Sequence, residues 1–160
     1  KMKMNKKVFL TCTVVLLSLS LAAQDISSIM NKYGKVENVE LVKINNFVLT
    51  MARMAADKES KQVLKKITGV KVLAADSTAN VKNLISDIED VTTRQNYEKI
   101  IEVREKGEKV NIYFKELGKN KTELLVVNSE KSGEVNLVLI SGNITPEEFK
   151  ELNNKDKNNK

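Results

Sequence analysis

The spacing of apolar residues divides the chain into an N-terminal apolar run, a region of helical spacing and a region of strand-like alternation. Residues 8–23 carry no charge and follow the basic pair Lys6–Lys7, and the first acidic residue is Asp25. A basic start, an apolar run and small residues at its end are typical of a secretory signal peptide. We therefore expect residues 1–24 to be a signal peptide that is cleaved near Ala22–Gln24.

The apolar run has two alternative interpretations. A membrane-spanning helix needs about 20 apolar residues, whereas this run ends at Ala23 and includes Thr and Ser side chains. An uncleaved tether at residues 8–23 remains the alternative to cleavage. A lipid on Cys12 would require the cysteine at the end of the run, and Cys12 lies near its start. We expect a mature protein without cysteine, hence without disulfide or thiol chemistry, and without a stable membrane span.

Helical spacing and one strand-like segment follow the run. Residues 26–34 have helical spacing and end at a glycine, and residues 36–44 alternate like a strand. Residues 45–67 fit two helices with a break near Asp57, where Asp57 or Ser60 would cap the second helix. The apolar positions that we expect to face the core are Ile26, Ile29, Met30, Tyr33, Phe47, Val48, Met51, Met54, Ala55, Val63, Leu64 and Ile67.

A second strand and a further helix come next. We expect Gly69 to end the preceding helix, residues 70–76 to form a strand, and Asp76 or Ser77 to cap the helix that follows. The inner face of that helix would be formed by Val81, Leu84, Ile85 and Ile88. Its opposite, solvated face would carry Asp87, Glu89 and Asp90.

Residues 97–144 switch to the alternation of strands. Three glycines interrupt this region among polar residues, at the spacing of antiparallel hairpins: Gly107, Gly118 and Gly133. Residues 124–127 and 137–140 are apolar on both faces, so we expect them to be central strands covered on both sides.

The chain closes with a helix start and a polar tail. Thr145, Pro146 and Glu148 match a capping box with proline at its favoured position. The short helix that begins there would dock through Phe149 and Leu152. Residues 153–160 contain no apolar residue, and we expect them to form a disordered basic tail.

These elements predict a single α+β domain at residues 25–152. Its antiparallel sheet would have about four to six strands, formed by a C-terminal meander and one or two strands from the first half. Two to four helices would pack with this sheet, in an arrangement resembling a split β-α-β unit.

Charge is concentrated at the two ends of the chain. The chain has 27 basic and 21 acidic residues, and residues 1–24 hold four of the basic and none of the acidic ones. The mature protein would carry 23 − 21 = +2, and residues 153–160 supply all of it, so residues 25–152 are neutral. A nucleic-acid binder should carry a basic stripe with aromatic residues beside it. We therefore do not expect nucleic acid as a partner.

Composition also limits the possible chemistry. The chain has no His and no Trp, three Tyr and four Phe. Without His it lacks the usual general base at neutral pH and the commonest zinc ligand. The small number of aromatic rings argues against a site that stacks on sugars. We assign no catalytic residue, no metal ligand and no cofactor.

Several segments resemble a known family. They are "FVLTMARMA" (47–55), "ITGVKVLAAD" (67–76), and the stretch that runs from Tyr97 through "EKGEKVNIYF" to "VNLVLISGNI" (135–144). Together they resemble the secreted Bacteroidetes-type family known as domain of unknown function 4252, over about Val36–Leu152. The resemblance implies an exported envelope protein of Gram-negative bacteria without a settled activity, and it supplies no catalytic residues.

Four patterns have a possible functional interpretation, and we prefer a structural one for each. Clustered acids could serve a glycosidase, but we expect solvated faces for Glu102 and Glu105, Glu147 and Glu148, and residues 87–90. Gly142 and Asn143 precede a helix and could bind an anion, but a strand-to-helix turn explains them. Met51 and Met54, near Met30, could line a binding groove, but we expect core positions. Asp76–Thr78 is similar to an O-glycosylation pattern of such bacteria, but we expect a helix cap.

Two hypotheses about function follow. The first is a non-catalytic binding or interaction module that binds an unknown envelope protein or glycan in the periplasm or outside the cell, through its sheet or a helix–sheet groove. The alternative is a carboxylate-based hydrolase acting on envelope or dietary glycans, which requires two acids roughly 5–10 Å apart in one cleft. The sequence does not identify the binding residues.

Overall fold

The computed structural model describes residues 24–56 and 58–148. The elements in chain order are α2 (Ile26–Tyr33), β1 (Val39–Ile44), α3 (Asn46–Ala55), α4 (Lys58–Lys66), β2 (Ile67–Ala75), α5 (Leu84–Arg94), β3 (Glu98–Glu105), β4 (Glu108–Gly118), β5 (Lys121–Glu130) and β6 (Val135–Gly142). Predictions for residues 1–23, Asp57 and 149–160, among them the signal peptide, Cys12 and the basic tail, lie outside the described residues.

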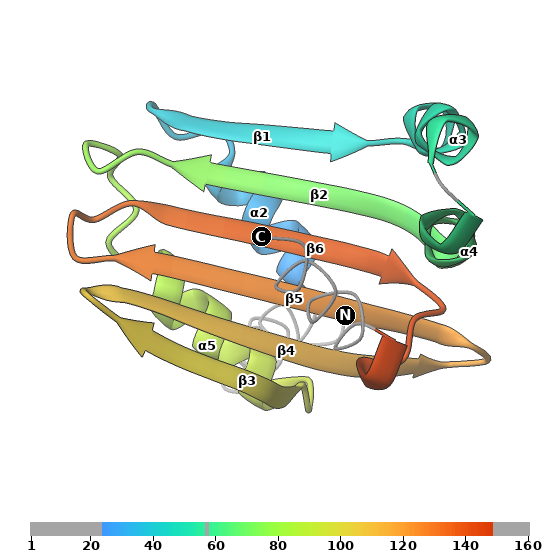
Figure 1. The fold of residues 1–160 in the computed structure, drawn as a ribbon. Helices are drawn as coiled ribbons and strands as arrows, with labels where there is room; N and C mark the ends of the chain where they lie inside the picture. Colours follow the sequence, from blue (N-terminus) through green and yellow to red (C-terminus); the bar gives the residue numbers. More distant parts are fainter. Residues whose placement is uncertain (1–23, 57, 149–160) are drawn as a thin grey trace, which may run out of the picture.

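The six strands form one antiparallel sheet in the order β1-β2-β6-β5-β4-β3 (Figure 1). Strands β3 to β6 form the predicted meander, and β6 then pairs with β2, which joins the two halves of the chain. Strands β5 and β6 lie at the centre of the sheet, as predicted, but the predicted cover on both faces is wrong for the described helices, because α2 and α5 lie on one face only. The α+β prediction is therefore confirmed.

The β3–β4 and β4–β5 turns are tight because consecutive residues adopt left-handed conformations. Lys106 (φ 46°) and Gly107 (φ 96°) make the β3–β4 turn, and Lys119 (φ 49°) and Asn120 (φ 59°) make the β4–β5 turn. Two consecutive residues with positive φ match the twist of antiparallel strands. The glycine spacing thus located both turns, although the second lies just beyond Gly118.

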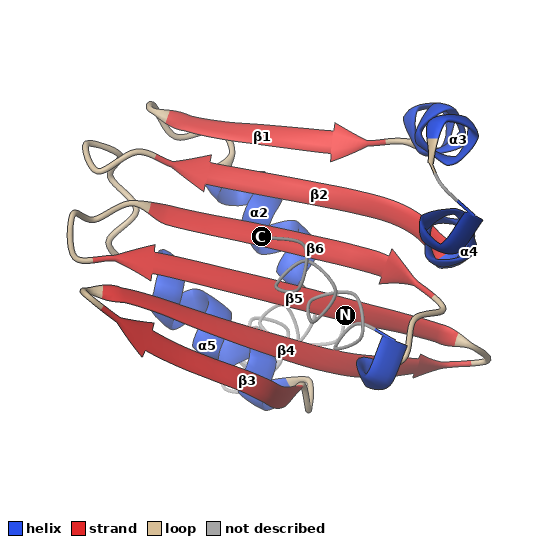
Figure 2. Ribbon diagram, in the orientation of Figure 1, coloured by secondary structure: helices blue, strands red, loops and turns tan. Residues whose placement is uncertain are grey.

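Helices α2 and α5 pack beside each other on one face of the sheet (Figure 2). Their apolar residues recur every three or four positions and therefore face the sheet. The predicted inner residues that are buried are Ile26, Ile29, Met30, Tyr33, Val81, Leu84 and Ile88. The sheet contributes Leu73, Leu125 and Leu137, whose exposure is 0%. The main core is the layer between these helices and the sheet.

Residues that alternate with the main core point to the opposite face of the sheet. Ile112, Phe114 and Leu124 form a second, smaller apolar cluster on that face. The helical turn at residues 146–148 lies on the same side (Figure 1). No other helix among residues 24–56 and 58–148 lies over this face in the same view.

Helices α3 and α4 connect β1 to β2 and lie beyond the ends of these strands (Figure 1). Arg53 of α3 joins the two helices to the sheet, because Nε donates to the Leu64 carbonyl (2.9 Å) and Nη2 to the Ile67 carbonyl (2.7 Å). The predicted division into two helices near Asp57 is confirmed.

The predicted core face of α3 is wrong for its methionines. Met51 and Met54 are 53% and 69% exposed, and Val48 is 49% exposed, whereas Leu49 is buried. Because α3 lies beyond the end of β1, an edge strand, no described helix or strand covers these three side chains.

Two predicted helix boundaries also differ from the structure. Helix α4 ends at Lys66 and β2 starts at the next residue, so Gly69 lies inside a strand, where the register with β6 shifts, and does not cap α4. Helix α5 starts at Leu84, with Asn83 as its cap residue. Asp76 accepts bonds within its own turn, because an Asp side chain readily bonds the backbone two residues on.

Candidate functional site

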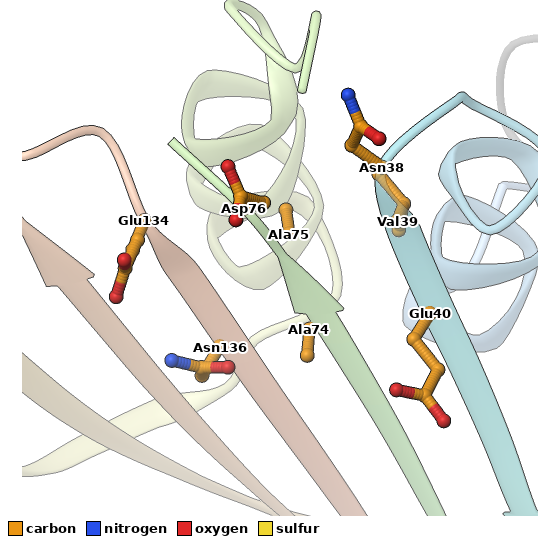
Figure 3. Close-up of a pocket in the computed structure, with 8 residues that line it drawn as sticks. All are labelled: Asn38, Val39, Glu40, Ala74, Ala75, Asp76, Glu134 and Asn136. Atoms are coloured by element: carbon orange, nitrogen blue, oxygen red, sulfur yellow. The ribbon is translucent and has the colours of Figure 1, made fainter. Parts of the chain in front are cut away.

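A shallow hollow of about 480 Å³ lies where β1 and β6 begin and β2 ends. Figure 3 shows Asn38 and Glu40 on the β1 side, Asp76 at the end of β2, and Glu134 and Asn136 on the β6 side. The hollow is therefore polar, with three carboxylates and two amides. None of the three tyrosines contributes to its lining.

Asp76 bonds to its own turn through one carboxylate oxygen. Its Oδ1 accepts from the Thr78 amide (2.8 Å) and from the Thr78 hydroxyl (2.9 Å), and more distantly from the Ser77 hydroxyl (3.3 Å). The Thr78 amide and hydroxyl together lower the pKa of Asp76 below its usual value. Asn38 Nδ2 donates to Thr78 Oγ1 (3.0 Å), which fixes the turn against the start of β1. The Asp76–Thr78 segment is thus an exposed turn.

At least one acid of each group singled out in the sequence makes a structural contact. Glu102 accepts from Lys99 (2.9 Å) and Arg104 (2.8 Å), and these bonds lower its pKa to about 2. Asp87 accepts a hydrogen bond from the Tyr33 hydroxyl of α2, and Glu148 is the acidic member of a capping box. The fold lowers the pKa of Asp87 and of Glu148 as well. A general acid of a glycosidase requires the opposite shift.

A second hollow, of about 360 Å³, lies between α5 and strands β3 and β4. Tyr97, Tyr113 and Lys99 are among the residues that line it. Burial, together with a 2.5 Å hydrogen bond from the Tyr97 hydroxyl to Glu123, raises the pKa of Tyr97 strongly. Lys115 Nζ lies 5.0 Å from the centre of the Tyr97 ring. Tyr97 is therefore held neutral in a fixed position, as expected of a packing residue.

The described aromatic side chains are not arranged as a sugar-binding platform. Tyr33, Tyr113 and Phe114 are buried, at 7%, 6% and 7% exposure, and Tyr97 is half-buried. Stacking requires an open ring face. None of these four rings is exposed.

A continuous apolar row crosses the sheet on the face opposite α2 and α5. The row contains one residue from each strand, paired in register: Val42, Val72, Val138, Val126, Ile112 and Ile101. We call this set the cross-sheet row. Its Val42 end, on edge strand β1, is 42% exposed, whereas Ile112 near the other end is 7% exposed. The apolar surface is therefore most accessible on the β1 side.

The cross-sheet row could not be read from the sequence alone. Each member stands in an alternating or wholly apolar segment, which the sequence does reveal. The alignment of the six residues depends on the register of β2 against β6, whose pairing joins distant segments. The two edge residues, Val42 and Ile101, carry no separate signal.

Gly142 serves packing. A Cβ on Gly142 would lie 2.3 Å from the Lys66 carbonyl oxygen, and that same oxygen accepts from the Asn143 amide (2.9 Å). The capping box that follows is confirmed, since Thr145 N–H donates to Glu148 (3.1 Å) and Glu148 N–H donates to Thr145 Oγ1 (3.3 Å). Glu148 also pairs with Lys66. These contacts agree with the predicted strand-to-helix turn, and they hold this turn against the end of α4.

Residues 24–56 and 58–148 contain no group of three or more acidic, His or Cys side chains placed to hold a metal ion. None of their helices is both long enough and apolar enough to traverse a bilayer.

Comparison with known proteins gives one match. A family model described as a domain of unknown function, DUF4252, matches residues 33–152. Searches found no curated protein and no solved structure that matches the chain. The family model spans every strand and all the helices except most of α2.

Proposed function

This chain belongs to the DUF4252 family, and from that premise we propose that it is an exported envelope protein whose folded domain binds another protein without catalysing a reaction. The observation that carries the proposal is the cross-sheet row. A protein partner with an apolar strand or helix would cover it from the β1 side, where Val42 is exposed. Apolar surface left open at the edge of a sheet is typical of interaction sites.

A protein partner fits this surface better than a glycan. The row is made only of Val and Ile, which bury apolar area but offer no ring for sugar stacking. The tyrosines lie on the helix-covered side of the sheet or between the two helices. Binding of a glycan is therefore the alternative result that the crosslinking experiment below distinguishes.

Binding without catalysis is supported by the state of the acidic groups. The hydrolase hypothesis would require one carboxyl with a raised pKa facing a second one. In the polar hollow, the Thr78 bonds lower the pKa of Asp76. The chain also lacks His, the residue that most often moves protons at neutral pH.

Export is supported by the N-terminal pattern alone. Residues 1–24 have the order of a cleavable signal peptide. Mass spectrometry of the protein isolated from the periplasm or medium of an expressing Gram-negative host should give a start near Gln24. A cell-retained protein that still carries residues 8–23 would instead support the tether.

Binding is tested by photo-crosslinking from the cross-sheet row in living cells. A crosslinking amino acid replaces Val72 or Val138 in turn, and the control replaces Lys121, an exposed residue of β5 away from the row. We expect one protein adduct from the row positions and none from Lys121. The adduct protein, purified, should bind the wild type and lose affinity at least tenfold for the Val42→Glu variant. Equal adducts from all three positions, or an adduct that is only a glycan, would overturn the proposal.

A further inference from the structure

Exposed apolar side chains are concentrated in one short part of the chain. Six large hydrophobic side chains are exposed among the residues that the structure describes, and four of them lie between Val42 and Met54. Three of the four are on α3: Val48, Met51 and Met54. Their spacing of three residues places them on one side of the helix. We call these three residues the α3 stripe.

The α3 stripe points outward because the other side of the helix is fixed. Leu49 is buried, at 4% exposure, and Arg53 donates two hydrogen bonds to the carbonyls of Leu64 and Ile67. Asn45 Oδ1 accepts from the Val48 amide (3.2 Å) and so holds the start of α3. These contacts fix the orientation of α3, so that the α3 stripe faces outward.

Positive charge accompanies the α3 stripe. Residues 42–67 contain six basic and two acidic residues, a net charge of 6 − 2 = +4. Because residues 25–152 are neutral, the remainder of the domain carries −4. Lys58, Lys61 and Lys65 follow the spacing i, i+3, i+7 and therefore share one side of α4. Among the carboxylates whose side chains the structure describes, none forms an ion pair with any of these three lysines.

We propose that the α3–α4 hairpin docks on an anionic lipid surface, with the α3 stripe entering the interface and the α4 lysines facing the lipid phosphates. Amphipathic helices bind membranes by burying apolar side chains below the headgroups while basic residues contact anionic lipids. Within the folded domain, the net negative charge outside residues 42–67 favours an approach to an anionic surface through the hairpin. This contact is separate from the protein-binding surface proposed above.

A lipid surface fits the hairpin better than a second protein. A stable protein interface buries about 800 Å² on each partner and uses roughly 20 to 30 residues a side, whereas the α3 stripe consists of three side chains on a ten-residue helix. Insertion into a bilayer needs no matching pocket and tolerates the flexible side chain of methionine. Charge complementarity selects anionic lipids over neutral ones.

The test measures insertion at the α3 stripe itself, so that residues 8–23 of the full chain do not interfere. In a Cys12→Ser background, Met54→Cys carries an environment-sensitive nitrobenzoxadiazole dye. Leu117→Cys, at an exposed residue (48%) of β4, carries the same dye as the matched control. Each labelled chain is mixed with vesicles of phosphatidylglycerol and phosphatidylcholine, or of phosphatidylcholine alone.

We expect a blue shift and brighter emission at position 54 with the anionic vesicles, and no change at position 117. The triple variant Lys58→Glu, Lys61→Glu, Lys65→Glu should weaken the response at position 54 by about tenfold or more in lipid concentration, in line with the attraction of each basic residue to an anionic surface. The control triple Lys82→Glu, Lys119→Glu, Lys121→Glu changes the net charge equally and should respond like the parent.

Three outcomes would overturn the lipid assignment. One is a dye at position 54 that does not respond to anionic vesicles. Another is an equal response to neutral vesicles, which would remove the role of the lysines. The third is a response without vesicles that grows with protein concentration, which would assign the stripe to contact between two copies of the chain. None of these outcomes bears on the partner of the cross-sheet row.

Discussion

The hydroxyl of Tyr33 on α2 donates a 2.9 Å hydrogen bond to the carboxylate of Asp87 on α5. Lys32 Nζ reaches the same oxygen at 3.0 Å. These contacts join the two helices that cover the main core, and they join segments 54 residues apart in the chain. Asp87 is therefore a link between helices, although the sequence places it on a solvated face.

Removing the Tyr33–Asp87 bond should destabilise the domain. We expect Tyr33→Phe to lower the free energy of unfolding by about 1 to 2 kcal/mol, the usual range for a bond to a charged group in a partly exposed setting. Urea unfolding monitored by circular dichroism measures the change. Asp90→Asn, at an exposed carboxyl on the same helix, is the control and should be neutral within about 0.5 kcal/mol. An equal loss in both variants would contradict the assigned contact.

Acid should weaken the same link. Burial opposes the charged form of Asp87, but the bonds from Lys32 and Tyr33 outweigh it and lower the pKa of Asp87. A carboxyl with a lowered folded pKa stabilises the protein above its unfolded pKa, and that contribution is lost as pH falls through the folded pKa. We expect the free energy of unfolding to drop as pH falls from about 5 to about 3, and to drop less steeply in Asp87→Asn. Parallel pH profiles would remove Asp87 as a source of the acid response.

The bond from Tyr97 to Glu123 should behave as a coupled pair. Tyr97→Phe leaves the Glu123 carboxylate without its donor in a half-buried position, which should cost about 1 to 3 kcal/mol. The double variant Tyr97→Phe with Glu123→Gln should recover part of this loss, because the remaining amide carries no charge. A double-mutant cycle from urea unfolding measures the coupling. Strict additivity of the two substitutions would contradict it.

Two glycines should respond oppositely to alanine. Gly142→Ala places a Cβ 2.3 Å from the Lys66 carbonyl oxygen and should destabilise the domain by about 1 to 3 kcal/mol. Gly69→Ala meets nothing within 4 Å, so the change should be neutral or slightly stabilising. Thermal unfolding of the two variants side by side checks the contrast. A harmless Gly142→Ala would show that α4 does not close on β6 as described.

The exposed methionines should be dispensable for stability. Met51→Lys and Met54→Lys should each change the free energy of unfolding by less than about 0.5 kcal/mol, as surface substitutions do. Leu49→Ala, on the buried side of the same helix, should cost about 2 to 5 kcal/mol. Chemical denaturation of the three variants gives the comparison. A large loss in Met51→Lys would restore the core position that helical spacing alone predicts.

Sequence patterns gave the elements of this fold but not their surroundings. Tyr33 is buried as its spacing predicts, because periodicity reports which side of a helix is apolar. The same rule failed for Met51, since it does not report whether anything lies opposite that side. Gly69 was assigned to a helix end on local chemistry, and pairing with β6 extended the strand over it.

The candidate binding surfaces depended on long-range pairing and so escaped prediction. The cross-sheet row exists because six strands align Val and Ile residues in register, and register is fixed by distant contacts. The α3 stripe was visible in the sequence as an apolar pattern, yet only the position of α3 at the end of β1 makes it a surface. The net positive charge of the α3–α4 hairpin follows from the sequence, but only after the structure gives the boundaries of the two helices.

The pairing of β6 with β2 also sets the order of events during synthesis. Until residues 135–142 have been synthesised, the β1–β2 pair and strands β3 to β5 cannot join in one sheet, because the strand that lies between them is missing. Before that point, the edges of β2 and β5 that pair with β6 are unpaired. Cooperative folding of the whole sheet therefore requires contacts between residues far apart in the sequence. A polypeptide that stops before residue 135 therefore cannot complete the six-stranded sheet, however well its other elements form.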